Sequence, residues 1–129
     1  MKKLLITLLL AVLSTSAMAE WVPINDDDIS TYYVDRATIR KAGNKVKIWG
    51  MTDSKTMQIY EGKYYLSNKS QFEYDCKNET SASVADLSFS DNMGSGQLVS
   101  SYYKNGLNPL PVSPGSIGEF VWKIACGKQ

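Results

Sequence analysis

Two stretches of the chain alternate apolar and polar side chains, which is the pattern of strands that bury one face. Residues 45–52 read KVKIWGMT, with Val46 and Ile48 on the expected core side. Trp49 falls on the opposite face, where it is either a ligand contact or, as we favour, a ring covered by its neighbours. Residues 70–91 alternate again, turn at residues 78–80 and continue as another strand. Both stretches predict neighbouring strands of an antiparallel sheet.

Further segments extend this pattern into a β-meander. Residues 31–35, 37–41 and 97–104 are rich in β-favouring side chains, and turns are expected at residues 43–44 and 91–96. The apolar parity shifts between Val84 and Leu87, which predicts a β-bulge near Ala85. We expect residues 20–30 to form a polar loop. Residues 53–67 are interpreted as mostly loop with some extended structure.

The period of the apolar residues changes to 3.6 near the C-terminus, which predicts an α-helix. The predicted fold is therefore α+β, a mainly antiparallel sheet with this helix packed on one face. The apolar stripe expected to face the sheet has Phe120 beside it and consists of Ile117, Val121, Ile124 and Ala125.

Two starts for this helix fit the sequence. In the first, Ser113 is the N-cap and Pro114 takes the first helical position. In the second, Ser116 is the N-cap and Glu119 completes a capping box three residues later. Both helices end at the same place, because Gly127 can adopt the left-handed conformation that closes a helix.

The first 19 residues have the organisation of a bacterial secretory signal peptide. A positive start is followed by an apolar run over residues 4–13 and by Ala17-Met18-Ala19, so cleavage is expected after Ala19. A membrane anchor is the alternative, but the run is about half of the roughly 20 residues that span a bilayer. Residues 20–129 then form one exported domain in the periplasm or on the outer cell surface. This domain starts without a cysteine, so we expect no lipid attachment there.

The chain has two cysteines, Cys76 and Cys126. In an oxidising compartment they are expected to form a disulfide that ties the helix to the sheet. The closed loop of about 50 residues corresponds to roughly 4 kcal/mol of stabilisation in the chain-entropy model. A reactive thiol or redox pair is the alternative, but the C-x-x-C spacing that lowers a thiol pKa is missing.

Charge and composition argue against nucleic acid and against common catalytic chemistry. Two of the 14 basic residues lie in the predicted signal peptide, which leaves 12 against 13 acidic ones and a formal charge of −1. That balance does not favour binding to nucleic acid or acidic lipid. The chain also has no histidine, the most common general base and neutral metal ligand.

No motif in the sequence predicts a catalytic, cofactor-binding or metal site. Residues 26–28 are three consecutive aspartates, but they lack the spacing and glycine of a calcium loop and are interpreted as a solvated turn. Residues 94–96 open no helix that could hold a phosphate. Residues 68–70 and 78–80 match the N-glycosylation pattern but are interpreted as turns. An enzyme would require Asp75 and Asp86 to meet in a cleft with raised pKa values.

The combined pattern resembles the surface-adhesin protein E family of bacterial exported proteins. The resemblance covers nearly all of residues 20–129. It is carried by Tyr32-Tyr33-Val34-Asp35 with Ile39, Val46-x-Ile48-Trp49, Ser67-x-Lys69, Phe72-Glu73-Tyr74-Asp75-Cys76, Tyr102 and Ile124-Ala125-Cys126.

The resemblance implies a six-stranded antiparallel sheet with the C-terminal helix fastened to its concave face by a disulfide. It also implies a surface adhesin that binds host extracellular-matrix or serum proteins of the laminin, vitronectin and plasminogen class. A soluble periplasmic binding or inhibitor protein with a non-host protein partner is the alternative. Both would have a protein partner, and neither would have an integral membrane segment after signal removal.

Two tyrosine pairs are the candidate binding surface. Tyr64-Tyr65 and Tyr102-Tyr103 could present aromatic rings to a protein partner. The alternative is that one tyrosine of each pair packs inward while its neighbour lies at the rim of the sheet.

Overall fold

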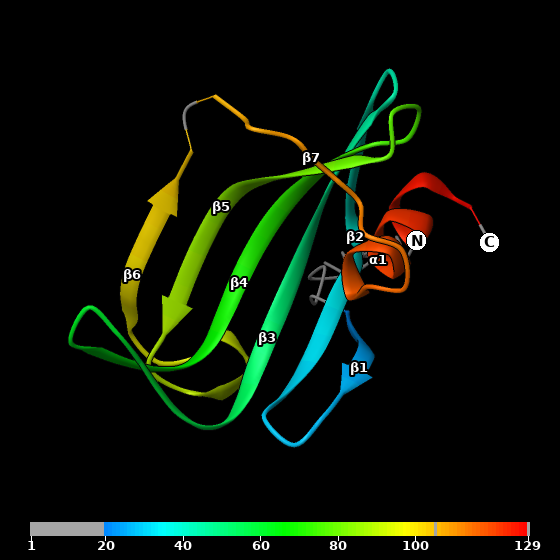
Figure 1. The fold of residues 1–129 in the computed structure, drawn as a ribbon. Helices are drawn as coiled ribbons and strands as arrows, with labels where there is room; N and C mark the ends of the chain where they lie inside the picture. Colours follow the sequence, from blue (N-terminus) through cyan, green and yellow to red (C-terminus); the bar gives the residue numbers. More distant parts are fainter. Residues whose placement is uncertain (1–19, 105, 129) are drawn as a thin grey trace, which may run out of the picture.

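Six strands cross a curved antiparallel sheet in the order of the sequence (Figure 1). This computed structural model describes residues 20–104 and 106–128, so the predicted signal peptide lies outside the described residues. A two-residue strand, β7 (Leu110–Pro111), also pairs with β5. The α+β meander predicted from the sequence is confirmed. Its six main strands are β1 (Trp21–Asp26), β2 (Ser30–Ala42), β3 (Lys45–Tyr60), β4 (Lys63–Asp75), β5 (Thr80–Phe89) and β6 (Leu98–Tyr103).

The helix α1 (Ile117–Cys126) packs on one face of the sheet, against β2, β3 and β4 (Figure 1). Alternating apolar residues of these strands form the sheet side of the core, as the period-two pattern predicts. The buried residues of the interface are Val34, Val46, Ile48 and Tyr74 from the sheet and Val121, Trp122 and Ala125 from the helix. Residues 20–104 and 106–128 contain no helix that is long and apolar enough to cross a membrane.

The face that α1 turns to the sheet differs from the predicted stripe. Val121 and Ala125 are buried as expected, but Ile117 is 42% exposed and Phe120 is 54% exposed. Trp122, which the predicted stripe omits, is buried instead. The position of Cys126 explains the difference, because its bond to Cys76 fixes the rotation of the helix about its axis.

The second of the two predicted helix starts is correct. Ser116 is the N-cap, and its hydroxyl oxygen accepts a hydrogen bond from the Glu119 backbone N–H at 3.1 Å. The Glu119 carboxylate accepts from the Gly115 N–H at 3.4 Å, one residue before the position of a standard capping box. Gly127 closes the helix with φ of 67°, as predicted.

A disulfide joins Cys76, just after β4, to Cys126 at the last residue of α1. The predicted pairing is thus confirmed. Both cysteines pack against the core cluster between sheet and helix. The Trp122 indole N–H donates to the Asp75 backbone carbonyl at 3.0 Å, so a second contact holds the helix to the same end of β4.

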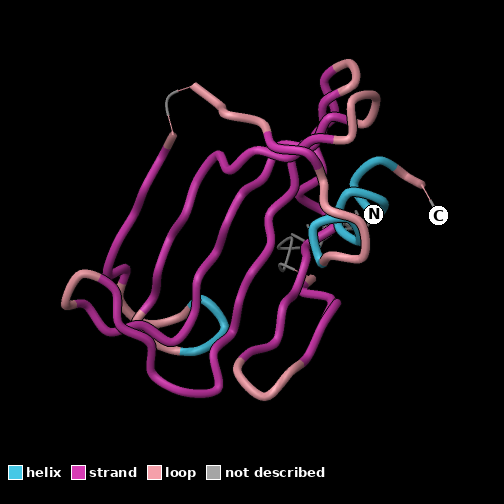
Figure 2. Tube along the Cα trace, in the orientation of Figure 1, coloured by secondary structure: helices cyan, strands magenta, loops and turns pink. Residues whose placement is uncertain are grey.

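The expected loops at residues 20–30 and 53–67 are wrong. Residues 21–26 form β1, which pairs with β2 from Trp21 opposite Asp35 to Asp26 opposite Thr31. Residues 53–60 continue β3, and β4 begins after a tight turn at Glu61-Gly62 (Figure 2). Both turn residues have positive φ, 48° and 76°, as a two-residue hairpin turn requires.

The predicted β-bulge and the predicted covering of Trp49 agree with the structure. Gln71 pairs with Ala85 while Phe72 pairs with Ser83, so Val84 is the extra residue of a β-bulge. The bulge lies next to the predicted position. The ring of Trp49 is half-buried, as favoured from the pattern.

The 3₁₀ turn η1 (Asn92–Gly94) covers part of the opposite face of the sheet. Met51, on the face opposite Ile48, is completely buried. The Ser67 hydroxyl donates to the Asp91 carbonyl at 2.6 Å and accepts from the Gly94 N–H at 2.8 Å. These bonds fix the connection between β5 and β6 against β4.

Two tyrosines on the helix side are largely buried. Burial raises the pKa of Tyr32 to about 12, and burial also raises the pKa of Tyr74, with the nearby Tyr32 adding to the effect. The Tyr32 ring lies directly over Gly50, where a Cβ would come within 2.1 Å of its hydroxyl oxygen. Gly50 thus makes room for an aromatic ring at the centre of the sheet.

We expect the free energy of unfolding to fall between pH 10 and pH 12. The Tyr32 phenol loses its proton near pH 10 in the unfolded chain but near pH 12 in the folded protein. The contribution of the raised pKa to the free energy of unfolding is therefore complete below pH 10. It is lost as the pH rises, by at most about 1.4 kcal/mol per pH unit for each tyrosine. Urea unfolding at several alkaline pH values measures this slope. Tyr32→Phe should make it shallower, and an unchanged slope in that variant would contradict the prediction.

Candidate functional site

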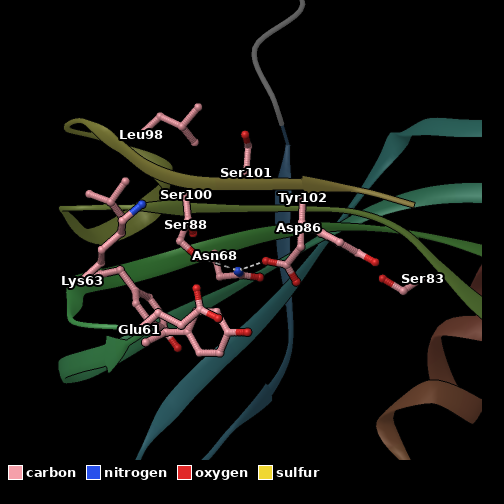
Figure 3. Close-up of a pocket in the computed structure, with 13 residues that line it drawn as sticks. Glu61, Lys63, Asn68, Ser83, Asp86, Ser88, Leu98, Ser100, Ser101 and Tyr102 are labelled. Atoms are coloured by element: carbon pink, nitrogen blue, oxygen red, sulfur yellow. Dashed lines mark hydrogen bonds between the residues drawn. The ribbon is translucent and has the colours of Figure 1, made fainter. Parts of the chain in front are cut away.

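A groove of about 860 Å³ lies between the outer half of the β3–β4 hairpin and strands β4, β5 and β6 (Figure 3). The hairpin forms one wall, and the three strands form the floor and the other wall. The groove combines aromatic, hydroxyl, amide and carboxylate side chains. The residues that line it are Tyr60, Glu61, Lys63, Tyr65, Asn68, Ser83, Asp86, Ser88, Leu98, Val99, Ser100, Ser101 and Tyr102.

An irregularity in β3 gives the hairpin its position. Asp53 pairs with Ser67, but the next paired residue on β3, Gln58, is opposite Tyr65. Five positions along β3 thus correspond to two along β4. Extra residues on one strand of a pair bend it and increase its twist. The outer hairpin consequently leaves the plane of the sheet.

The groove continues the face of the sheet that α1 covers. Along β4, Phe72 and Tyr74 pack into the core under the helix, and Asn68 and Ser70 follow on the same face by the alternation of the strand. The helix does not reach this part of the sheet, which Figure 3 shows with α1 to one side of the groove. One sheet face therefore changes from apolar beneath α1 to polar in the groove.

Asn68 and Asp86 form the centre of a hydrogen-bonded floor. The Asn68 amide donates one bond to Asp86 Oδ1 and another, of 3.1 Å, to Ser88 Oγ (Figure 3). The Ser70 hydroxyl lies 2.7 Å from Asn68 Oδ1 and 3.2 Å from Asp86 Oδ2. These contacts hold the carboxylate in a fixed orientation. A carboxylate has about four acceptor sites, so Asp86 can accept further bonds from a ligand.

Exposed apolar and aromatic side chains surround this polar floor. Tyr60 is 62% exposed, Tyr102 is 59% exposed and Leu98 is 54% exposed. Tyr102 is paired with Asp86 in the β5–β6 register, which places a phenol ring beside the carboxylate. Tyr65 is half-buried in the wall of the hairpin. The groove thus offers hydrogen bonds at its floor and ring surfaces at its rim.

The predicted tyrosine surface divides between the groove and the outside. Tyr65 and Tyr102 line the groove, whereas Tyr64 and Tyr103 do not. The alternative that one member of each pair packs inward is wrong for the second pair, because Tyr103 is 65% exposed and Tyr102 is nearly as exposed. Tyr103 follows Tyr102 along β6, so the two side chains point to opposite faces of the sheet.

The polar floor was not predicted from the sequence. Asn68 and Ser70 lie inside β4, contrary to the turn predicted there, whereas Asn78 and Glu79 lie in the predicted turn and Thr80 begins β5. A usable pattern was present, because polar residues replace apolar ones at alternate positions of β4 as the strand is followed back from Tyr74. The β5 partners of Asn68, which are Asp86 and Ser88, could be identified only from the β4–β5 register and its bulge at Val84.

The carboxylates needed for an enzyme do not meet. Asp75 ends β4 and pairs with Thr80, whereas Asp86 is paired with Ser70. Backbone N–H groups of Asn78 and Lys77, each 2.9 Å from Asp75 Oδ1, lower the pKa of Asp75, and the neighbouring Asn78 side chain adds to this. A general acid requires the opposite shift. The Asp75–Asp86 pairing is therefore excluded.

The turn predicted at residues 26–28 is confirmed in part, because Asp26 ends β1 whereas Asp27 and Asp28 lie in the exposed bend before β2. Asp27 Oδ1 accepts from the backbone N–H groups of Ser30 and Ile29 at 2.9 and 2.8 Å, which lowers the Asp27 pKa. The Asp26 carboxylate pairs with Lys55 at 2.9 Å. Residues 20–104 and 106–128 contain no group of three or more histidine, cysteine, aspartate or glutamate side chains placed to bind a metal ion.

A second hollow, of about 490 Å³, lies beside the outer side of α1. Phe120 lines it together with basic side chains, among them Arg36 and Lys123. It lacks the interlocked polar floor of the groove. Phe120 is therefore a useful comparison site, because it is as exposed as the tyrosines of the rim but lies on another element.

Comparison with known proteins decides the family. A sequence model described as surface-adhesin protein E matches residues 21–127. The chain belongs to this family. The surface-adhesin protein E match spans all the strands, the groove and the helix, and membership supports a surface adhesin that acts by binding a protein partner. No curated protein matches the chain in sequence.

Solved structures of Haemophilus influenzae protein E show the same fold. Crystal form II of Haemophilus influenzae protein E has a TM-score of 0.63 and 16% identity over 86% of this chain and 97% of that chain. Protein E from non-typeable Haemophilus influenzae has a TM-score of 0.62 and 17% identity over 88% of this chain and 79% of that chain. At these identities the likeness establishes the shared fold, and function has to be argued from the groove.

Proposed function

We propose that this protein is an adhesin displayed on the cell surface, where it binds a host extracellular-matrix or serum protein of the laminin, vitronectin or plasminogen class. Its membership of the surface-adhesin protein E family supports display on the cell surface. The groove and its rim are the proposed contact surface.

The aromatic rim is the observation that carries the proposal. Tyr60, Leu98 and Tyr102 are each more than half exposed around one groove, although large apolar side chains tend to be covered in a monomer. Tyrosine is enriched at protein interfaces, where its ring provides contact area and its hydroxyl a hydrogen bond. Such rings, set around a polar centre, suit recognition of another protein.

Surface display is tested first, by antibody labelling of intact and permeabilised cells. A known periplasmic protein serves as the leakage control. We expect labelling of intact cells. Labelling that appears only after permeabilisation would contradict the proposal and leave the soluble periplasmic binding or inhibitor role, with a non-host partner.

Binding is then measured with immobilised laminin, vitronectin and plasminogen and with protein purified after export from the full-length chain. The Tyr60→Ser, Tyr102→Ser double variant should bind at least about tenfold more weakly, because tyrosine is enriched among the few interface residues whose truncation costs about 2 kcal/mol or more. Phe120→Ser, which removes a similarly exposed ring on α1, should bind like the unaltered protein. Equal losses in both variants would contradict the assignment to the groove.

A further inference from the structure

We infer that the groove is a saccharide site, which takes one hydroxyl-rich sugar unit that is neutral or carries an amino group. This inference rests on the proposed function, because it assigns a ligand class to the surface at its centre. The recognised sugar would be part of a glycan on the host protein or cell.

The hydrogen-bonding groups of the floor match alcohol groups. A sugar hydroxyl both donates and accepts, so a site for it needs acceptors and donors side by side. Asp86 supplies free acceptor positions, and the hydroxyl of Ser88 accepts from Asn68 and keeps its own proton to donate. Ser100 lies opposite Ser88 in the β5–β6 register and adds a second hydroxyl to the groove.

The floor is also preorganised. Asn68 uses both amide protons on Asp86 and Ser88 and its carbonyl oxygen on Ser70, so it orients the carboxylate and has little capacity left for a ligand. A carboxylate fixed in this way can accept two neighbouring hydroxyl groups without first being ordered. Hydrogen bonds to an ionised acceptor are about twice as strong as neutral ones.

The rim supplies the apolar half of sugar recognition. The ring hydrogens of a hexose make one face of it weakly positive and apolar, and such a face packs on the negative face of an aromatic ring. Tyr102 is beside Asp86 and more than half exposed, so a sugar bonded to the carboxylate can lie against the phenol. Tyr60 offers a second ring on the hairpin wall. The volume of about 860 Å³ is sufficient for one or two sugar units.

Charge limits the kind of sugar. Asp86 forms no salt bridge within the described residues, and its side-chain partners are the neutral Asn68 and Ser70. Glu61 adds a second carboxylate at the hairpin turn, against one cation, Lys63. An acidic sugar would place its carboxylate or sulfate near an unpaired carboxylate. Sialic acid and sulfated sugars are therefore expected to be rejected.

The experiment uses an array of immobilised galactose, mannose, glucose, N-acetylglucosamine, glucosamine, sialic acid and sulfated hexose. The probe is protein purified after export from the full-length chain. We expect binding to at least one neutral or amino sugar and none to the acidic sugars. Asp86→Asn and Tyr102→Ala should each weaken that binding by about tenfold or more.

Two variants make the test specific. Tyr103→Ala removes the adjacent, equally exposed ring on the other side of β6 and should leave sugar binding within about twofold. Tyr102→Phe keeps the ring and should retain most of the binding, which separates a lost stacking surface from a disturbed strand. Near-ultraviolet circular dichroism confirms that each variant is folded.

The outcomes separate this inference from the proposed function. Binding to matrix proteins without binding to any sugar on the array would overturn the saccharide site and leave the adhesin intact. Sugar binding that survives Asp86→Asn and Tyr102→Ala would also overturn it, because another surface would then be responsible. Sugar binding through the groove without any host-protein binding would instead contradict the proposed function. If the protein is an adhesin and the groove is its saccharide site, enzymatic removal of N-glycans from the host protein should abolish binding between the two proteins.

Discussion

Replacing both cysteines, Cys76→Ala with Cys126→Ala, is expected to lower the free energy of unfolding by about 4 kcal/mol. The bond closes a loop whose ends are 50 positions apart, and a loop of this length loses that much denatured-state freedom in the chain-entropy model. Domains of this size are stable by roughly 5–15 kcal/mol, so the loss is a large fraction of the total. The closed loop contains β5, β6, β7 and α1 itself, and the bond brings its two ends together.

Urea unfolding followed by tryptophan fluorescence measures this loss. Reduction of the unaltered protein should shift its midpoint as far as the double substitution does, and the reductant should leave the double variant unchanged. A difference below about 1 kcal/mol would show that packing alone holds the helix, contrary to the expectation from loop closure.

The strands that the sequence predicted well are those with one buried face. Val46 and Ile48 alternate with lysine and tryptophan, and both are buried beneath α1 as the pattern required. The register shift at Val84 was also readable, since a bulge changes the parity of the apolar positions. Period and parity are local properties, so a single sequence records them.

The strands that the sequence did not predict lack such a face. β1 is an edge strand whose exposed and half-buried residues do not alternate. The outer hairpin exposes Met57, Ile59 and Tyr64, so no period-two contrast between apolar and polar positions marks it. In both segments backbone hydrogen bonds to a neighbouring strand form the sheet. The residues of a segment do not by themselves specify the strand with which it pairs.

The groove was unpredictable for a related reason. Asn68 and Asp86 are 18 positions apart and become partners only through the β4–β5 register. Tyr102 was identified as a candidate because of its type, but its proximity to Asp86 depends on β6 pairing with β5. The hairpin wall depends on three extra positions in β3. The sequence thus predicted Tyr65 and Tyr102, one aromatic residue on each side of the groove, but not the polar centre between them.

Trp122→Ala is expected to lower the free energy of unfolding by about 3–5 kcal/mol, the usual cost of removing a large buried aromatic side chain. Trp122 is 7% exposed and packs with Val121 and Ala125 into the core beneath α1. Its indole N–H also donates to the Asp75 carbonyl at 3.0 Å. Trp122→Phe retains a ring but leaves that carbonyl without this partner, so it should lose less, about 1–3 kcal/mol.

Phe120→Ala is the matched control, since Phe120 is on the same helix but 54% exposed, and its loss should stay within about 0.5 kcal/mol. Equal losses at both positions would contradict the packing of α1 described above. Trp122→Ala in the cysteine-free background then tests how the helix is held. Trp122 and the disulfide both connect α1 to the end of β4, so their effects should not be additive. If removing both costs less than the sum of the single losses, the helix has already left the sheet after the first change, and packing and cross-link stabilise one docked state together.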